Sequence, residues 1–151
     1  MRRRAKVLIA VIAVITLCAL LLIVFPKGAL SAEHAELLFR IHRSRFENAA
    51  ALILEQRQES GASVPPGVSD IDLHETQSGC VDFYMGGFGI APSSAFWGVI
   101  CTAEDSPIGW GGLDVEYMWD GEGWYWQEES SDNHSYVTKL DDHWYLYQMW
   151  F

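Results

Sequence analysis

The sequence predicts an α+β protein with an N-terminal transmembrane helix and an amphipathic helix packed on a mostly antiparallel β-meander sheet of about five to seven strands. Residues 7–25 form an unbroken apolar run, and residues 31–60 carry apolar side chains at helical spacing. From residue 70 onward, short runs rich in aromatic and β-branched residues alternate with Gly and Asp turns. No crossover helices are available between these runs, so the strands are expected to pair antiparallel.

The predicted membrane anchor is Val7–Phe25, which follows a basic flank at residues 1–6. Its nineteen residues would span roughly 28 Å as a helix, close to the thickness of a bilayer's hydrocarbon core. Four positive charges precede the run, and only Lys27 closely follows it. The positive-inside rule therefore predicts a single-pass protein of the cell membrane, with a cytoplasmic N-terminus and an extracytoplasmic C-terminal domain.

A cleaved signal peptide is the alternative for this segment, because Ala29-Leu30-Ser31 before Ala32 resembles a signal-peptidase site. Signal peptides usually have an apolar core of about 7 to 15 residues, so the longer run here favours retention. Under both interpretations the remainder of the chain is exported.

The amphipathic helix is expected at residues 31–60, with Ser31 as N-cap and Gly61 as a stop. Its apolar face is formed by Leu37, Leu38, Ile41, Ala49, Leu52 and Ile53. A proline-containing linker at residues 61–69 then leads into an acidic, aromatic-rich β-domain at residues 70–151. About 120 residues suffice for one domain, so we expect residues 31–151 to form one folded unit.

Seven strands are predicted within the β-domain, with hairpin turns at residues 120–123 and 141–142. They are Ile71–Glu75, Cys80–Met85, Ala95–Thr102, Leu113–Trp119, Gly123–Glu128, Ser135–Leu140 and His143–Trp150. The glycine-rich residues 86–89 are interpreted as part of a flexible loop between the second and third strands.

The charge of this domain excludes polyanionic partners. Residues 60–151 contain fifteen Asp or Glu residues and one basic residue, Lys139. Nucleic acid would be repelled, whereas a basic protein surface or a divalent cation would be attracted.

Two small groups of residues are candidates for a disulfide and a metal site. If Met85 lies opposite Phe96, then Cys80 lies opposite Cys101, and an exported domain can keep such a disulfide. Two buried thiols are the alternative. Asp70, Asp72 and His74 alternate along one predicted strand, so they share a face and could hold a divalent ion, although solvated polar residues would show the same pattern.

Aromatic residues are the main indication of a binding surface. Residues 83–151 contain seven Trp, six Tyr and four Phe, and both faces of the last strand are apolar. One helix covers one face, so the second face must meet loops, another molecule or the bilayer. We expect the binding residues to be Trp124, Trp126, Trp144 and Trp150, with an envelope protein or glycan as partner.

No catalytic motif or cofactor-binding motif is present, so the sequence predicts a non-catalytic binding module of the cell envelope rather than an enzyme. Two alternatives stay open. The apolar helix, Pro26 break, amphipathic helix and antiparallel sheet resemble the layout of type IV pilins and pseudopilins, which implies a filament subunit; cleavage after Ala5 would put Ala10 where that family has glutamate. A metal-dependent envelope enzyme would use Asp70, Asp72 and His74.

Overall fold

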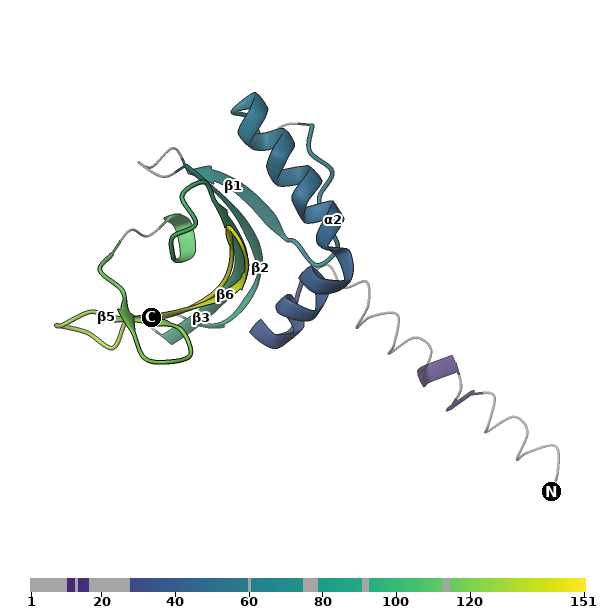
Figure 1. Cartoon of the computed structure of the whole chain (residues 1–151). Helices are drawn as coiled ribbons and strands as arrows, with labels where there is room; N and C mark the ends of the chain where they lie inside the picture. The colour runs from purple at the N-terminus through teal and green to yellow at the C-terminus, as the bar shows by residue number, and fades with distance from the viewer. Residues whose placement is uncertain are drawn as a thin grey trace, which may run out of the picture.

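The computed structural model describes residues 11–12, 14–16, 28–59, 61–74, 79–90, 93–112 and 115–151. It confirms the α+β class: a single antiparallel sheet of seven strands has one helix on its outer side. Figure 1 shows the sheet strongly curved, with α2 (Ala32–Gln56) along its convex side and the short 3-10 helix η1 (Trp110–Gly112) inside the curve. We call the side toward α2 the helix face and the opposite side the concave face.

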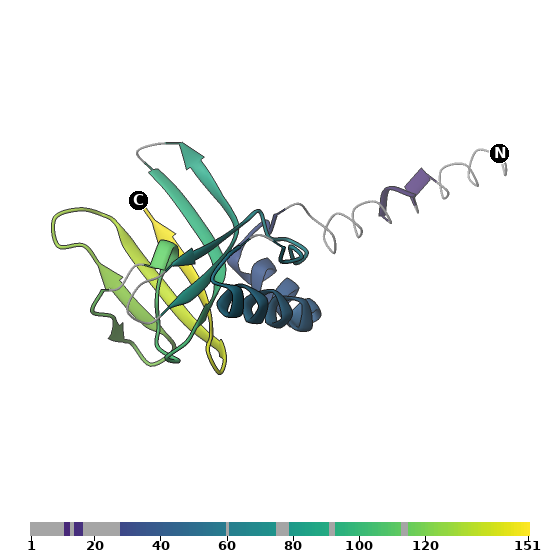
Figure 2. The same ribbon diagram turned by 90° about the horizontal axis from the view of Figure 1, so that it is seen from above.

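The sheet confirms both predicted hairpins and six of the predicted strands to within a few residues or with an extension, whereas the strand predicted at Leu113–Trp119 is formed only by Met118–Trp119. The strands are β1 (Asp70–His74), β2 (Cys80–Ile90), β3 (Ser93–Thr102), β4 (Met118–Trp119), β5 (Trp124–Gln127), β6 (His134–Asp141) and β7 (Trp144–Trp150). Their order across the sheet is β1-β2-β3-β7-β6-β5-β4. Figure 2 shows the long β2–β3 hairpin extending beyond the rest of the sheet.

The glycine-rich stretch is a strand and not the loop that we expected. Residues Gly86 to Ile90 extend β2 and pair with Ser93 to Trp97 of β3, after a bulge at Met85. At Gly87 a Cβ would be 2.6 Å from the Ala95 carbonyl oxygen, so here glycine permits close strand pairing.

Helix α2 begins where the sequence predicted but bends in the middle. Ser31 is its N-cap, and the Ser31 hydroxyl accepts a hydrogen bond from the His34 amide at 3.2 Å. Non-helical dihedrals at His42 bend the helix, and it ends at Arg57 in the left-handed conformation, before Gly61.

The bend also changes which residues of α2 face the sheet. Leu38 and Ile53 of the predicted apolar face are buried, together with Phe39 and Phe46, whereas Leu37 and Ile41 are exposed. A regular 3.6-residue periodicity therefore predicted only part of the buried face.

The core on the helix face is built around aromatic contacts. Phe46 of α2 packs edge-on against Phe83 of β2, with ring centroids 5.2 Å apart. Trp144 of β7 lies 5.0 Å from Phe39 and 5.8 Å from Phe83, measured between ring centroids. These rings fix α2 across β2, β3 and β7.

The concave face is covered by the chain between β3 and β4, which is one of the outcomes that we considered for the second apolar face. Ile108 is buried there against Tyr145 and Tyr147. The Trp110 ring stacks on Phe96 at a centroid distance of 5.3 Å. Both faces of the sheet are thus largely buried.

Among the described residues, no helix is long and apolar enough to cross a membrane. The predicted anchor Val7–Phe25 lies outside the described residues except at positions 11–12 and 14–16, which are helical. The anchor therefore stays a prediction from the sequence.

Candidate functional site

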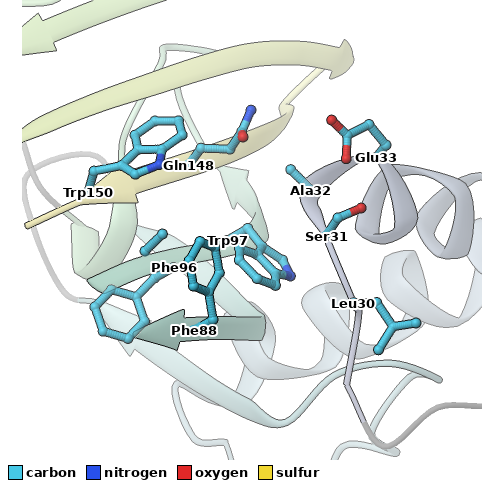
Figure 3. A pocket seen from close by; sticks show the side chains of 10 residues that line it. Leu30, Ser31, Ala32, Glu33, Phe88, Phe96, Trp97, Gln148 and Trp150 are labelled. Carbon is cyan, nitrogen blue, oxygen red and sulfur yellow. The ribbon is translucent and has the colours of Figure 1, made fainter. Parts of the chain in front are cut away.

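An apolar groove opens on the helix face, next to the first turn of α2. It consists of two neighbouring hollows that share Phe88, Ala95 and Trp150, and we call it the aromatic groove. The first hollow has a volume of about 190 Å³ and is lined by Leu30, Ser31, Ala32, Glu33, Phe88, Ala95, Phe96, Trp97, Gln148 and Trp150 (Figure 3). The second, of about 200 Å³, is also lined by Ser93, Ser94, Asp132, His134 and Phe151.

Strand register explains why these side chains meet. Phe88 lies opposite Ala95, Ala95 lies opposite Trp150, and Trp150 lies opposite His134, so the four form one row across β2, β3, β7 and β6. Cross-strand neighbours in such a row have side chains on the same face. The small side chain of Ala95 leaves a gap between the rings of Phe88 and Trp150, and this gap is the floor of the groove.

Neighbouring rings orient the groove's aromatic side chains. The Trp150 indole and the His134 imidazole are stacked, with centroids 4.6 Å apart and an angle of 11° between the planes. The His134 Nδ1 atom is 2.8 Å from the Asp132 carbonyl oxygen. On the other side, Phe88 packs on Trp97 at a centroid distance of 5.8 Å but stays 69% exposed. Phe88 can therefore contact a ligand without any rearrangement of the core.

Carboxylates border the groove. Glu33 lies in the first turn of α2, where hydrogen bonds to Ser31 and to its own backbone lower the pKa of its carboxyl. Asp132 lies at the far end, beside His134. An apolar floor with negatively charged borders is suited to an apolar ligand with positive charges at its edges.

The four predicted tryptophans do not form one surface. Trp150 lines the aromatic groove. Trp144 is buried in the core between Phe39 and Phe83, so its prediction as a binding residue was wrong. Trp124 and Trp126 are half-buried and lie opposite Val137 and Ser135. Those partners place both tryptophans on the concave face, away from the groove.

Phe88 and Trp97 are the groove residues that the sequence reasoning missed. Phe88 was assigned to a loop, and that assignment hid the alternation that puts Phe88 in the same cross-strand row as Trp150. Continuing the alternation of Phe83 and Met85 through the glycines would have placed Phe88 on the opposite face, because the bulge at Met85 shifts the pattern by one residue.

The predicted metal ligands do not converge. Among the described residues there is no group of three or more His, Cys, Asp or Glu side chains that could hold a metal ion. Asp70 and Asp72 are exposed on β1, and the side chain of His74 lies beneath Gly112 of η1. The three share a face, as predicted, but that arrangement alone does not bring their ligand atoms together.

The predicted disulfide is also absent, because the predicted register was wrong by one residue. Cys80 lies opposite Thr102, and Cys101 lies opposite Val81. A shift of one residue reverses the face of a side chain. Cys80 is thus in the concave-face core and Cys101 in the helix-face core, both as buried thiols. Burial raises the pKa of the Cys101 thiol to about 12.

A carboxyl buried on the concave face has a strongly raised pKa. Asp82 is 2% exposed, and burial raises its pKa to about 7. One oxygen of Asp82 accepts a hydrogen bond of 3.0 Å from the Gly111 amide. The other faces the buried hydroxyl of Tyr147, and neither of these two atoms has a partner in hydrogen-bond geometry. Asp82 therefore holds η1 against the sheet in a setting that favours its protonated form.

No protein-family model, curated protein or solved structure matches the chain.

Proposed function

We propose that the protein is a small single-pass membrane protein with an extracytoplasmic domain that binds an envelope protein through the aromatic groove, without catalysis. The observation that carries the proposal is the Phe88–Ala95–Trp150–His134 row, which presents the exposed ring of Phe88 and the half-buried rings of Trp150 and His134 beside two hollows. Exposed aromatic clusters bordered by polar groups are typical of recognition surfaces.

The structure of the Ala29–Ser31 segment supports retention of the anchor over cleavage. Ala29 is buried; its amide donates a hydrogen bond of 2.7 Å to the Met85 carbonyl oxygen. Ser31 caps α2. Cleavage after Ser31 would remove the Ala29 contact to the sheet and the helix cap together, so the candidate cleavage site is part of the fold.

A protein segment is favoured over a glycan by the composition of the groove. Its floor consists of aromatic rings and Ala95, and the polar side chains that line the first hollow, Ser31, Glu33 and Gln148, are fewer than the apolar ones. Sugar rings present many hydroxyl groups that need hydrogen-bond partners, whereas apolar side chains need none. The acidic borders at Glu33 and Asp132 then favour a partner with Lys or Arg beside its apolar residues.

Fluorescence titration of the full-length protein in nanodiscs tests this function. The two probes are a soluble peptide of alternating Leu and Lys and an oligomer of N-acetylglucosamine. We expect the peptide to bind and the Phe88→Ala variant to bind it at least about tenfold more weakly, because an interface anchor is typically worth 1–2 kcal/mol or more. Met118→Ala is the matched control, because Met118 is 63% exposed but lies on β4, outside the groove.

Each outcome of the titration has a defined meaning. Equal peptide affinity in wild type and Phe88→Ala would show that the groove is not the binding site. Binding of the oligosaccharide alone would replace the protein partner by a glycan. Topology is checked separately by adding protease to intact cells, which should remove the domain that carries residues 28–151.

A further inference from the structure

The chain enters the folded domain at one fixed point of the sheet. Besides the Ala29–Met85 bond, the Trp97 Nε1 atom donates a hydrogen bond of 3.2 Å to the Ala29 carbonyl oxygen. A Cβ on Gly86 would be 2.5 Å from that same oxygen, so the absence of a side chain at Gly86 allows Ala29 to lie against β2. The position of Ala29 relative to the aromatic groove is therefore defined by backbone contacts.

The distance from this point to the predicted anchor is short. Only Pro26 and Lys27 separate Phe25 from Gly28. At about 3.3–3.6 Å per residue, the three steps from Phe25 to Gly28 span at most about 11 Å. The polar layer on each side of a bilayer is roughly 5–7 Å thick. If Phe25 ends the membrane span, the part of the domain around Gly28 lies within the lipid headgroups or at most about 6 Å outside them.

We propose that Leu30 and Phe88 insert into the interfacial layer of the membrane that holds the anchor. Leu30 is 72% exposed and Phe88 is 69% exposed, and both line the first hollow, directly beside the entry point (Figure 3). Apolar side chains at this depth are removed from water, and this transfer has a favourable free energy. The inference rests on the proposed anchor and deepens the proposed function, since it places the mouth of the aromatic groove at the membrane surface.

Charge indicates which lipids suit this contact. Glu33 borders the same hollow, Asp132 borders its neighbour, and the β-domain is strongly acidic. Anionic headgroups would be repelled, so the contact depends on apolar insertion and favours zwitterionic lipid. A partner bound in the groove would then be a juxtamembrane segment of another membrane protein.

A fluorescent label on a cysteine can report the depth of each site in the full-length protein. Cys18 is first replaced in the Cys18→Ala variant so that it cannot take up the dye. Cys80 and Cys101 can stay, because both are buried and react poorly in the folded state. Leu30→Cys and Phe88→Cys are each labelled with an environment-sensitive dye, and Met118→Cys on β4 is the exposed control. Each protein is placed in phosphatidylcholine vesicles with or without brominated acyl chains, which quench the dye only at short range.

Flotation of the vesicles and quenching of the dye separate the two proposals. We expect the proteins to float with the vesicles and the labels at positions 30 and 88 to lose at least about twice as much fluorescence as the label at 118. Flotation with equal quenching at all three positions would overturn the membrane contact and leave the anchor intact. Failure to float would overturn the anchor, and the membrane contact with it. Weaker quenching in vesicles rich in phosphatidylglycerol would support the role assigned to charge.

Discussion

Tyr147 lies directly opposite Gly98 on the neighbouring strand, and its ring occupies the space that a side chain at position 98 would need. A Cβ on Gly98 would be 2.5 Å from the Tyr147 hydroxyl oxygen and 2.5 Å from the Phe83 carbonyl oxygen. The concave-face core around Tyr147 thus depends on the missing side chain of Gly98.

Gly98→Ala is therefore expected to lower the free energy of unfolding by about 2–4 kcal/mol, because one of the two obstructing atoms belongs to the backbone and cannot rotate away. The measurement is urea unfolding of the full-length protein in micelles, followed by tryptophan fluorescence. Ser93→Ala, an exposed change on the same strand, should stay within about 0.5 kcal/mol of wild type. Equal stability of the two variants would contradict this packing argument.

Trp97→Phe should loosen the attachment of residues 28–31 to the sheet. The substitution keeps an aromatic ring but removes the donor to the buried Ala29 carbonyl, which costs about 1–3 kcal/mol when the acceptor finds no new partner. Hydrogen exchange checks this locally: the Ala29 amide should exchange at least about tenfold faster than in wild type. Trp126→Phe, which alters a half-buried tryptophan on β5, should leave that rate unchanged.

Asp82 should make the protein less stable as the pH rises from about 4 to about 7. Its pKa is about 7 in the folded protein, against an ordinary value of 3.8, so the folded state binds more protons than the unfolded state in this range. The free energy of unfolding then falls with pH, by at most about 4 kcal/mol at about 1.4 kcal/mol per pKa unit. Nearby Asp72 and Asp70 add to the rise in pKa.

The variant that tests this is Asp82→Asn, compared with wild type by urea unfolding at pH 4.5 and pH 8. Asparagine keeps the shape without the ionisation, so the difference in stability between the two pH values should shrink. Asp142→Asn, an exposed carboxyl at the β6–β7 turn, should keep the wild-type pH dependence. An unchanged pH dependence in Asp82→Asn would mean that the buried carboxyl does not take up a proton in this range.

Thiol reactivity should confirm that Cys80 and Cys101 are reduced. Alkylation without reductant should spare both in the folded protein, because both are buried, and modify both after unfolding. Mass spectrometry of the peptides distinguishes them from Cys18. A disulfide would instead leave both residues unmodified after unfolding until a reductant is added.

Most of the fold could be predicted from local patterns. The alternation of apolar and polar residues that marks a strand, and the residues that mark a turn, each extend over only a few positions of the sequence. The hairpin at Asp120 is an example: the Asp120 carboxylate accepts hydrogen bonds from the amides of Glu122 and Gly123, at 3.0 and 2.9 Å. Register depends on longer-range geometry. The continuation of β2 through five more residues and the bulge at Met85 could not be predicted from the glycines, and together they place Cys80 opposite Thr102 and not opposite Cys101.

The candidate site was harder to predict for a related reason. Trp144 and Trp150 alternate onto the same face of β7, and the sequence pattern treats them alike. Only the position of α2 separates them, because α2 covers Trp144 and begins beside Trp150. The extent of a helix across a sheet is a tertiary property, so the distinction between core and groove needs the structure.

The two borders of the sheet limit how any partner can attach. On β1, the amides of Ile71 and Leu73 already donate to the carboxylates of Asp70 and Glu59, at 3.0 and 2.8 Å. On the opposite border, β4 is only two residues long. Along β1 and β4, an incoming peptide would therefore find little unpaired backbone on which to build an eighth strand. These two borders therefore resist edge-to-edge pairing between neighbouring copies of the domain.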